Sequence, residues 1–147
     1  MAELTRSVTI NAPIEKVFDL ATDVGKFWVC APDVAVRDVE LTPDGVGSSA
    51  RLWSHFLGFH MEGSIEYTEV VRPERIVARV SFGVEKPLWV FTFEPVDAGT
   101  TMTGQGEWHV NAPAVGKPLE EWMAKSHGEF LETLLANFKS HVESAAG

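Results

Sequence analysis

The sequence predicts an α+β fold in which one antiparallel sheet of seven strands is covered on one face by helices. Seven segments of strand-like character are separated by turn residues, two short helical patterns lie between the first and second segments, and a long amphipathic pattern ends the chain. The 147 residues fit a single domain, residues 1–147, which is long enough to bury a core.

The strands are expected where apolar residues alternate with polar ones or form short apolar runs between turns. They are 3–10, 34–41, 48–56, 59–71, 76–82, 89–96 and 100–110. Asn11-Ala12-Pro13 ends the first strand, and helices are expected at 13–21 and at 24–30 after Asp23. Pro43-Asp44-Gly45 supplies turn residues for a hairpin between the second and third strands.

A long helix is expected from Pro118 to about Ala145. Its apolar residues recur at helical spacing and form one stripe: Leu119, Trp122, Met123, Phe130, Leu131, Leu134, Leu135, Phe138 and Val142. Pro118 suits the first helical position, where its missing N–H has no partner to lose. His127 falls near the centre of the stripe, so we expect it to face whatever the helix covers.

The last two strands predict a hairpin with Ala98-Gly99 as a two-residue turn. In that register Phe93 pairs with Gly104, Phe91 with Gly106, and Trp89 with Trp108, and all of these residues share the inner face of the sheet with Pro95 and Met102.

An earlier hairpin has two possible registers, which differ in what they place inside. If Leu57-Gly58 is a two-residue turn, Ser54, Met61 and Gly63 face inward, and Tyr67 follows them. A three-residue turn would instead turn the polar set inward: Arg51, Trp53 and His55. The second register predicts a more polar, more enzyme-like pocket.

Glycine is expected at three inward positions, Gly63, Gly104 and Gly106. Glycine inside a strand packs nothing, so it indicates a bend, a close backbone approach or empty volume. Large side chains surround these positions, and this arrangement favours an apolar cavity between the sheet and the last helix, of about 300 Å³ or more.

Composition excludes several kinds of partner. The net charge of -9 argues against a nucleic-acid partner, and no apolar run approaches the length of a membrane span. The five His show no helical pair at four-residue spacing and no accompanying Cys pair, so no metal site is expected, and no cofactor either. The first residues lack the pattern of a secretory signal, so we expect a cytoplasmic protein.

A set of turn and core residues resembles the bacterial polyketide cyclase/dehydrase and lipid-transport family. The resemblance rests on Ile10, Ala12-Pro13, Val17-Phe18, Asp23, Phe27-Trp28, Pro32, Gly45, Gly47, Glu69-Val70, Arg72-Pro73, Arg75-Ile76 and Gly99-Thr100-Thr101. That family belongs to the START-like (SRPBCC) superfamily with the birch-pollen allergens. The resemblance implies a helix-grip fold, in which a curved sheet wraps around the terminal helix and leaves a cavity.

The hypothesis for function is therefore binding or transport of a hydrophobic small molecule, which is lipid-like, aromatic or polyketide-like. The expected ligand-binding residues line the inner face: Ser54, Met61, Gly63, Tyr67, Trp89, Phe91, Gly104, Gly106, Trp108, Met123, His127 and Phe130. One alternative is a polyketide cyclase or dehydratase in which His127 and Tyr67 move protons. Another is a protein-interaction module like the co-chaperone relatives, for which Trp53 on the outer face is the hint. The sequence makes no prediction of oligomeric state.

Overall fold

The computed structural model describes the backbone of residues 2–56, 59–81, 86–108 and 112–146, without the side chains of 2, 55, 56, 59, 112–123, 145 and 146. Within these ranges the strands are β1 (Ala2–Ile10), β2 (Val34–Glu40), β3 (Ser49–Phe56), β4 (Phe59–Val71), β5 (Arg75–Ser81), β6 (Leu88–Val96) and β7 (Gly99–Trp108). The helices are α1 (Ile14–Thr22), α2 (Val24–Trp28) and α3 (Ala112–Ala146). None of the described helices combines the length and the apolar character needed to cross a membrane.

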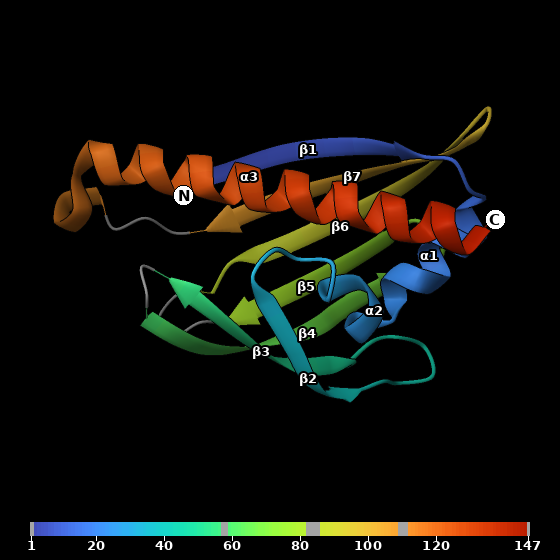
Figure 1. Ribbon diagram of the computed structural model, residues 1–147, viewed down its shortest axis with the longest axis horizontal. Helices are drawn as coiled ribbons and strands as arrows, with labels where there is room; N and C mark the ends of the chain where they lie inside the picture. Colours follow the sequence, from blue (N-terminus) through green and yellow to red (C-terminus); the bar gives the residue numbers. More distant parts are fainter. Residues whose placement is uncertain (1, 57–58, 82–85, 109–111, 147) are drawn as a thin grey trace.

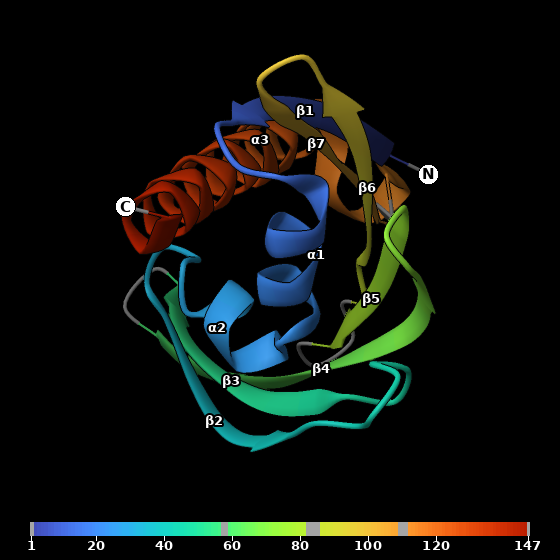
Figure 2. The same ribbon diagram turned by 90° about the vertical axis from the view of Figure 1, so that its right-hand side faces the viewer.

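The strands form one antiparallel sheet in the order β1-β7-β6-β5-β4-β3-β2. The predicted α+β fold is confirmed. Strands β2 to β7 pair in chain order as hairpins, and β1 lies at the edge of the sheet beside β7 (Figure 1). The sheet is strongly curved, with α1 and α2 inside its curve and α3 along the side where β1 lies (Figure 2). Because both short helices follow β1 directly, the chain fills the concave face before it builds β2.

Helix α2 carries Phe27, whose ring contacts both the sheet and α3. The Asp23 carboxylate accepts hydrogen bonds from the backbone N–H groups of Gly25 and Lys26, which caps the helix. Phe27 then lies edge-to-face with Phe91 of β6 and with Phe138 of α3, both at 4.9 Å between ring centroids. A single buried side chain therefore contacts the sheet and the terminal helix together.

Helix α3 begins at Ala112, so the prediction that it begins at Pro118 was wrong. Pro118 lies inside the helix, where its ring and missing N–H oppose straight helical geometry. The first turns of α3 bend away from the axis of the remaining helix (Figure 1). The stripe itself is confirmed over the described side chains, because the buried residues of α3 include Leu131, Leu134, Leu135, Phe138 and Val142.

Polar contacts fix α3 against the edge strand β1. Arg6 pairs with Glu132 at 2.8 Å, and the Lys139 ammonium donates a hydrogen bond to the Thr9 carbonyl at 2.9 Å. At the end of β1 the Asn11 backbone N–H donates to the Glu143 carboxylate. These contacts are exposed and individually weak. Their effect is to set the position of the helix along a strand edge that would otherwise be unpaired.

The β6–β7 hairpin differs from the prediction in register. Asp97 and Ala98 form the turn, and Gly99 is the first residue of β7, paired with Val96. Every pair is therefore shifted by two residues, so that Trp89 pairs with Gly106 and not with Trp108. In this register Gly99 passes close to the end of β1, where a Cβ would lie 2.1 Å from the Ile10 carbonyl oxygen, so a glycine is required within the strand. A shift of two keeps each side chain on its predicted face.

The β3–β4 hairpin has the first of the two predicted registers. Phe56 pairs with Phe59 and Ser54 with Met61, so two residues connect the strands, although Leu57 and Gly58 lie outside the described residues. Arg51 and Trp53 are on the outer face of the sheet. His55 is opposite His60 in the ladder, but its side chain is not among those described.

The buried stripe of α3 predicts a large asymmetry between its two faces. Leu134 is fully buried, so Leu134→Ala should lower the free energy of unfolding by about 2–5 kcal/mol through lost contacts and a residual cavity. Glu129 is exposed one turn earlier, and Glu129→Ala should change it by less than about 0.5 kcal/mol. Urea unfolding measures both. Equal losses in the two variants would contradict this packing of the helix.

Candidate functional site

A connected group of rings lies where α3 crosses the inner face of the sheet. We call it the aromatic wall: Trp28, Trp89, Trp108, His127 and Phe130. Phe130 lies 6.5 Å from Trp28 and 5.8 Å from Trp89 between ring centroids. His127 then links Trp89, at 6.2 Å, to Trp108, at 4.2 Å. The wall therefore draws on α2, β6, β7 and α3, which are far apart in the sequence.

The glycines of β7 make room for rings. A Cβ on Gly106 would lie 2.4 Å from Cζ3 of Trp89, its cross-strand partner. A Cβ on Gly104 would lie 2.8 Å from Leu131 and 3.1 Å from Phe91, which is again the cross-strand partner. Of the predicted alternatives, a close approach holds at Gly104 and Gly106 and empty volume does not, because neighbouring side chains cover the space that a Cβ would take. They allow a close approach between backbone and ring.

Other residues of the predicted site occupy the far end of the inner face. Ser54 and Met61 form a cross-strand pair and are both half-buried, and Gly63, opposite Leu52, is half-buried as well. Phe91 is buried in the core beside Phe27. The side chain of Met123 lies outside those described.

Tyr67 has an internal partner. It is fully buried, and its hydroxyl donates a hydrogen bond to the Ala21 carbonyl oxygen at 2.7 Å. Burial raises the pKa of this hydroxyl above its usual range, an effect that the neighbouring Trp28 side chain partly opposes. The bond joins β4 to α1. Tyr67 therefore has a structural role, and its hydroxyl hydrogen is already used in the hydrogen bond to Ala21.

His127 lies face to face with Trp108. The two ring planes differ by 7°, and the imidazole is half-buried. Both rings belong to the aromatic wall, so the expectation that His127 faces the space under the helix agrees with the described geometry. The rings that His127 contacts are the indoles of Trp108 and Trp89, and such stacking restricts the orientation of the imidazole.

Trp28 was not among the residues predicted for the site. Trp28 is 1% exposed, and it brings α2 into the aromatic wall through its contact with Phe130. The signal was present, because Phe27-Trp28 belongs to the residues that carry the family resemblance. Spacing alone could not place it inside, since a helix of five residues is too short to show a reliable apolar stripe.

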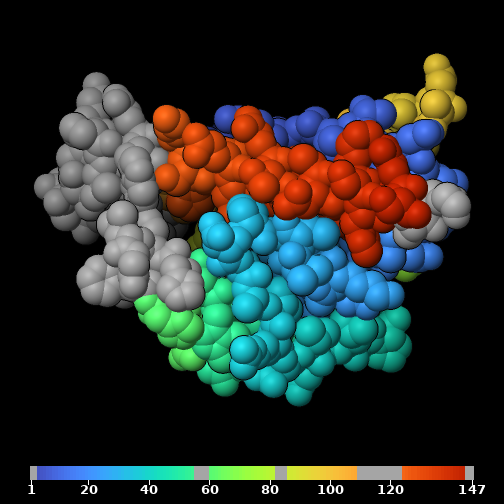
Figure 3. Space-filling model, viewed as in Figure 1, coloured from blue at the N-terminus to red at the C-terminus, as the bar shows by residue number. Residues whose placement is uncertain are grey.

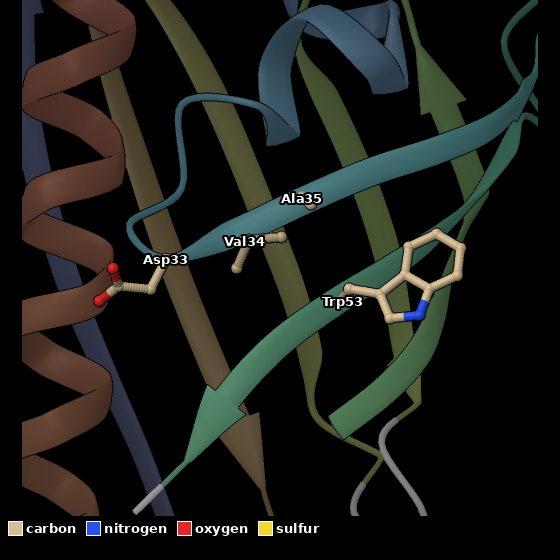
Figure 4. Close-up of a pocket in the computed structure, with 4 residues that line it drawn as sticks. All are labelled: Asp33, Val34, Ala35 and Trp53. Carbon is tan, nitrogen blue, oxygen red and sulfur yellow. The ribbon is translucent and has the colours of Figure 1, made fainter. Parts of the chain in front are cut away.

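A separate pocket of about 580 Å³ opens at the start of β2, lined by Asp33, Val34, Ala35 and Trp53. Asp33 points toward α3, and Trp53 projects from β3 (Figure 4). In the space-filling view the surface is hollowed between α3 and the start of β2 (Figure 3). The Trp53 ring is held under the Arg37 guanidinium, 4.7 Å from the centroid, and its indole N–H donates to Glu62.

Comparison with known families decides the assignment of the chain. The model of the family described as polyketide cyclase/dehydrase and lipid transport matches residues 1–143. The chain belongs to this family. A comparison with curated proteins gives no match. Membership supports binding of hydrophobic ligands in general, and it specifies neither a ligand nor a reaction.

Solved structures similar to this family member share its START-like helix-grip fold. A protein from Thermus thermophilus has a TM-score of 0.77 at 19% identity, covering 99% of this chain and 100% of its own. A START superfamily protein from Mycobacterium smegmatis has a TM-score of 0.76 at 19% identity, with 97% and 98% covered. Ara h 8.0201 has a TM-score of 0.66 at 16% identity, with 97% and 98% covered. At these identities the likeness concerns the fold.

The same substitution is expected to have opposite effects at Gly106 in β7 and at Gly128 in α3. Gly106→Ala should lower the free energy of unfolding by about 1–3 kcal/mol, because the methyl group overlaps the rigid Trp89 indole. In α3, a Cβ on Gly128 meets only the end of the Arg6 side chain, at 2.9 Å, which must move slightly, and its exposed pair with Glu132 contributes little to stability. Replacing this helical glycine by alanine should raise the free energy of unfolding by up to about 1 kcal/mol. Urea unfolding compares them, and a stabilised Gly106→Ala protein would refute the ring-over-glycine packing.

Proposed function

We propose that this protein binds a hydrophobic small molecule, lipid-like, aromatic or polyketide-like, between the inner face of the sheet and α3, and carries it without chemical change. The observation that carries the proposal is the aromatic wall, in which five rings from four elements meet under the terminal helix. Aromatic side chains offer large apolar surfaces at low entropic cost, which suits a flat or branched apolar ligand.

The half-buried members of the wall mark the side from which a ligand would make contact. Phe130 and His127 are half-buried, whereas Trp28, Trp89 and Trp108 are each no more than 3% exposed. A ligand that packs on Phe130 and His127 would complete their burial. Ser54, Met61 and Gly63, also half-buried on the inner face, would extend the same surface toward β3 and β4.

The polar groups favour a carrier over a cyclase. Enolisation and loss of water need an acid and a base that exchange protons with the substrate. The Tyr67 hydroxyl donates a hydrogen bond to the Ala21 carbonyl, and burial holds its pKa above the usual range. His127 packs its ring on Trp108. The pair proposed for proton transfer therefore lacks one of its two members.

The outer face offers weaker support for a protein-interaction module. Trp53 is the large ring on that face, but Arg37 covers it and Glu62 accepts its N–H. A tryptophan held by its own chain in this way is less available to a partner than an uncovered one. On the inner face, Phe130 and His127 are half-buried and adjoin three further rings, so that face offers the larger apolar surface to a small molecule and is the stronger candidate.

An apolar fluorescent dye, 1-anilinonaphthalene-8-sulfonate, tests the proposal. The wild type should bind it with increased fluorescence, and Phe130→Ala should weaken binding about tenfold, because about 1.4 kcal/mol of apolar contact is lost. Trp53→Ala is the matched control, since it truncates an aromatic residue on the outer face. Its dissociation constant should stay within about twofold of the wild type.

Two results would count against the proposal. If the folded wild type does not bind the dye, the family resemblance does not extend to a binding site for apolar molecules. If Trp53→Ala loses binding while Phe130→Ala keeps it, the dye occupies the pocket at the start of β2, and the outer face becomes the functional one.

A further inference from the structure

Trp108 carries a buried hydrogen-bond donor that the described part of the chain leaves unused. The side chain is 2% exposed, and among the described residues its indole N–H has no hydrogen-bond partner. Buried tryptophans usually place this N–H against an acceptor, and a buried donor left unpaired costs about 1–3 kcal/mol. Trp53 shows the usual arrangement, because its N–H donates to Glu62. The unpaired donor of Trp108 therefore calls for an acceptor from elsewhere.

The surroundings of Trp108 hold this donor in place. Its indole lies nearly parallel to the His127 imidazole, at 4.2 Å between ring centroids, and its backbone pairs with that of Ala2 in β1. His127 also contacts Trp89, at 6.2 Å between ring centroids, and the Trp89 indole is packed over Gly106. A donor held by packed rings loses little freedom when it binds an acceptor, so it discriminates strongly between ligands with and without one.

Trp28 has the second unpaired indole N–H, and its setting differs. It is 1% exposed, and it lies close enough to the Tyr67 hydroxyl to lower the pKa of that group. The Tyr67 oxygen can therefore take up part of its hydrogen-bonding demand, since a hydroxyl that donates once still has lone pairs to accept. No such group accompanies the Trp108 N–H among the described residues.

We propose that Trp108 is a specificity-determining residue, whose indole N–H donates a hydrogen bond to a carbonyl oxygen of the bound ligand. The ligand class is then an apolar ring compound with at least one accepting oxygen. An indole N–H can only donate, so it favours acceptors and offers nothing to a ligand ammonium or to a pure hydrocarbon. A carbonyl suits this wall better than a hydroxyl, because a hydroxyl also carries a hydrogen that would need an acceptor of its own. This proposal rests on the proposed function.

A pair of probes of nearly identical shape isolates the hydrogen bond. Fluorene and 9-fluorenone have the same ring skeleton, and only the second carries a carbonyl. The dissociation constants of both should be measured by equilibrium dialysis on the full chain, for the wild type, Trp108→Phe and Trp28→Phe. Trp108→Phe keeps an aromatic ring and removes the N–H. Trp28→Phe makes the same chemical change at the other end of the aromatic wall.

The expected result is a change in selectivity at one position. Relative to the wild type, Trp108→Phe should weaken fluorenone binding about three- to tenfold more than fluorene binding, as expected for one hydrogen bond. Trp28→Phe should alter the ratio of the two constants by less than about twofold. An unchanged ratio in Trp108→Phe, or an equal change in both variants, overturns the role of Trp108 while leaving the proposed function intact.

A second measurement on the wild type alone keeps the proposal testable if Trp108→Phe does not fold. The carbonyl stretching frequency of fluorenone falls when the oxygen accepts a hydrogen bond, so the bound ketone should absorb at lower frequency than in an alkane. Absorption at the alkane position would overturn the proposal. If the wild type binds neither fluorene nor fluorenone, the proposed function itself fails, and the role of Trp108 fails with it.

Discussion

The edge-to-face packing of Phe27 against Phe91 and Phe138 is the contact on which the rest of the structure depends. It joins α2, the centre of the sheet and α3 at one point, with both ring separations at 4.9 Å. Phe18 of α1 adds a further edge-to-face contact with Phe93 of β6. The two short helices therefore pack inside the curve of the sheet (Figure 2). Beside them, rings from α2, the sheet and α3 form the aromatic wall.

The fold was largely predictable from the sequence because its signals are local. Alternation identified seven strands, and the stripe of α3 identified its buried residues, including Leu134 and Phe138. Two errors came from contacts between distant segments and from a bent helix. Gly99 looked like a turn residue, yet it is required where β7 passes the Ile10 carbonyl. The start of α3 was placed at Pro118, because a proline signals a first turn more often than a bent interior.

The inward facing of several candidate residues was predictable, but their arrangement was not. Period-two alternation correctly put Trp89, Gly104 and Gly106 on one face, since even the wrong register preserves facing. Alternation cannot say whether a neighbouring ring fills the space above a glycine, and here rings fill it. The internal bond from Tyr67 to Ala21 likewise depends on where α1 packs, which no local pattern contains.

The proposed ligands bind at the aromatic wall and not in the pocket at the start of β2. The chain has five tryptophans, so a ¹H–¹⁵N spectrum should contain five indole signals, which single Trp→Phe variants would assign. On titration with fluorene, the signals of Trp89 and Trp108 should shift while that of Trp53 stays in place. A shift confined to Trp53, or no shift at any of them, would contradict it.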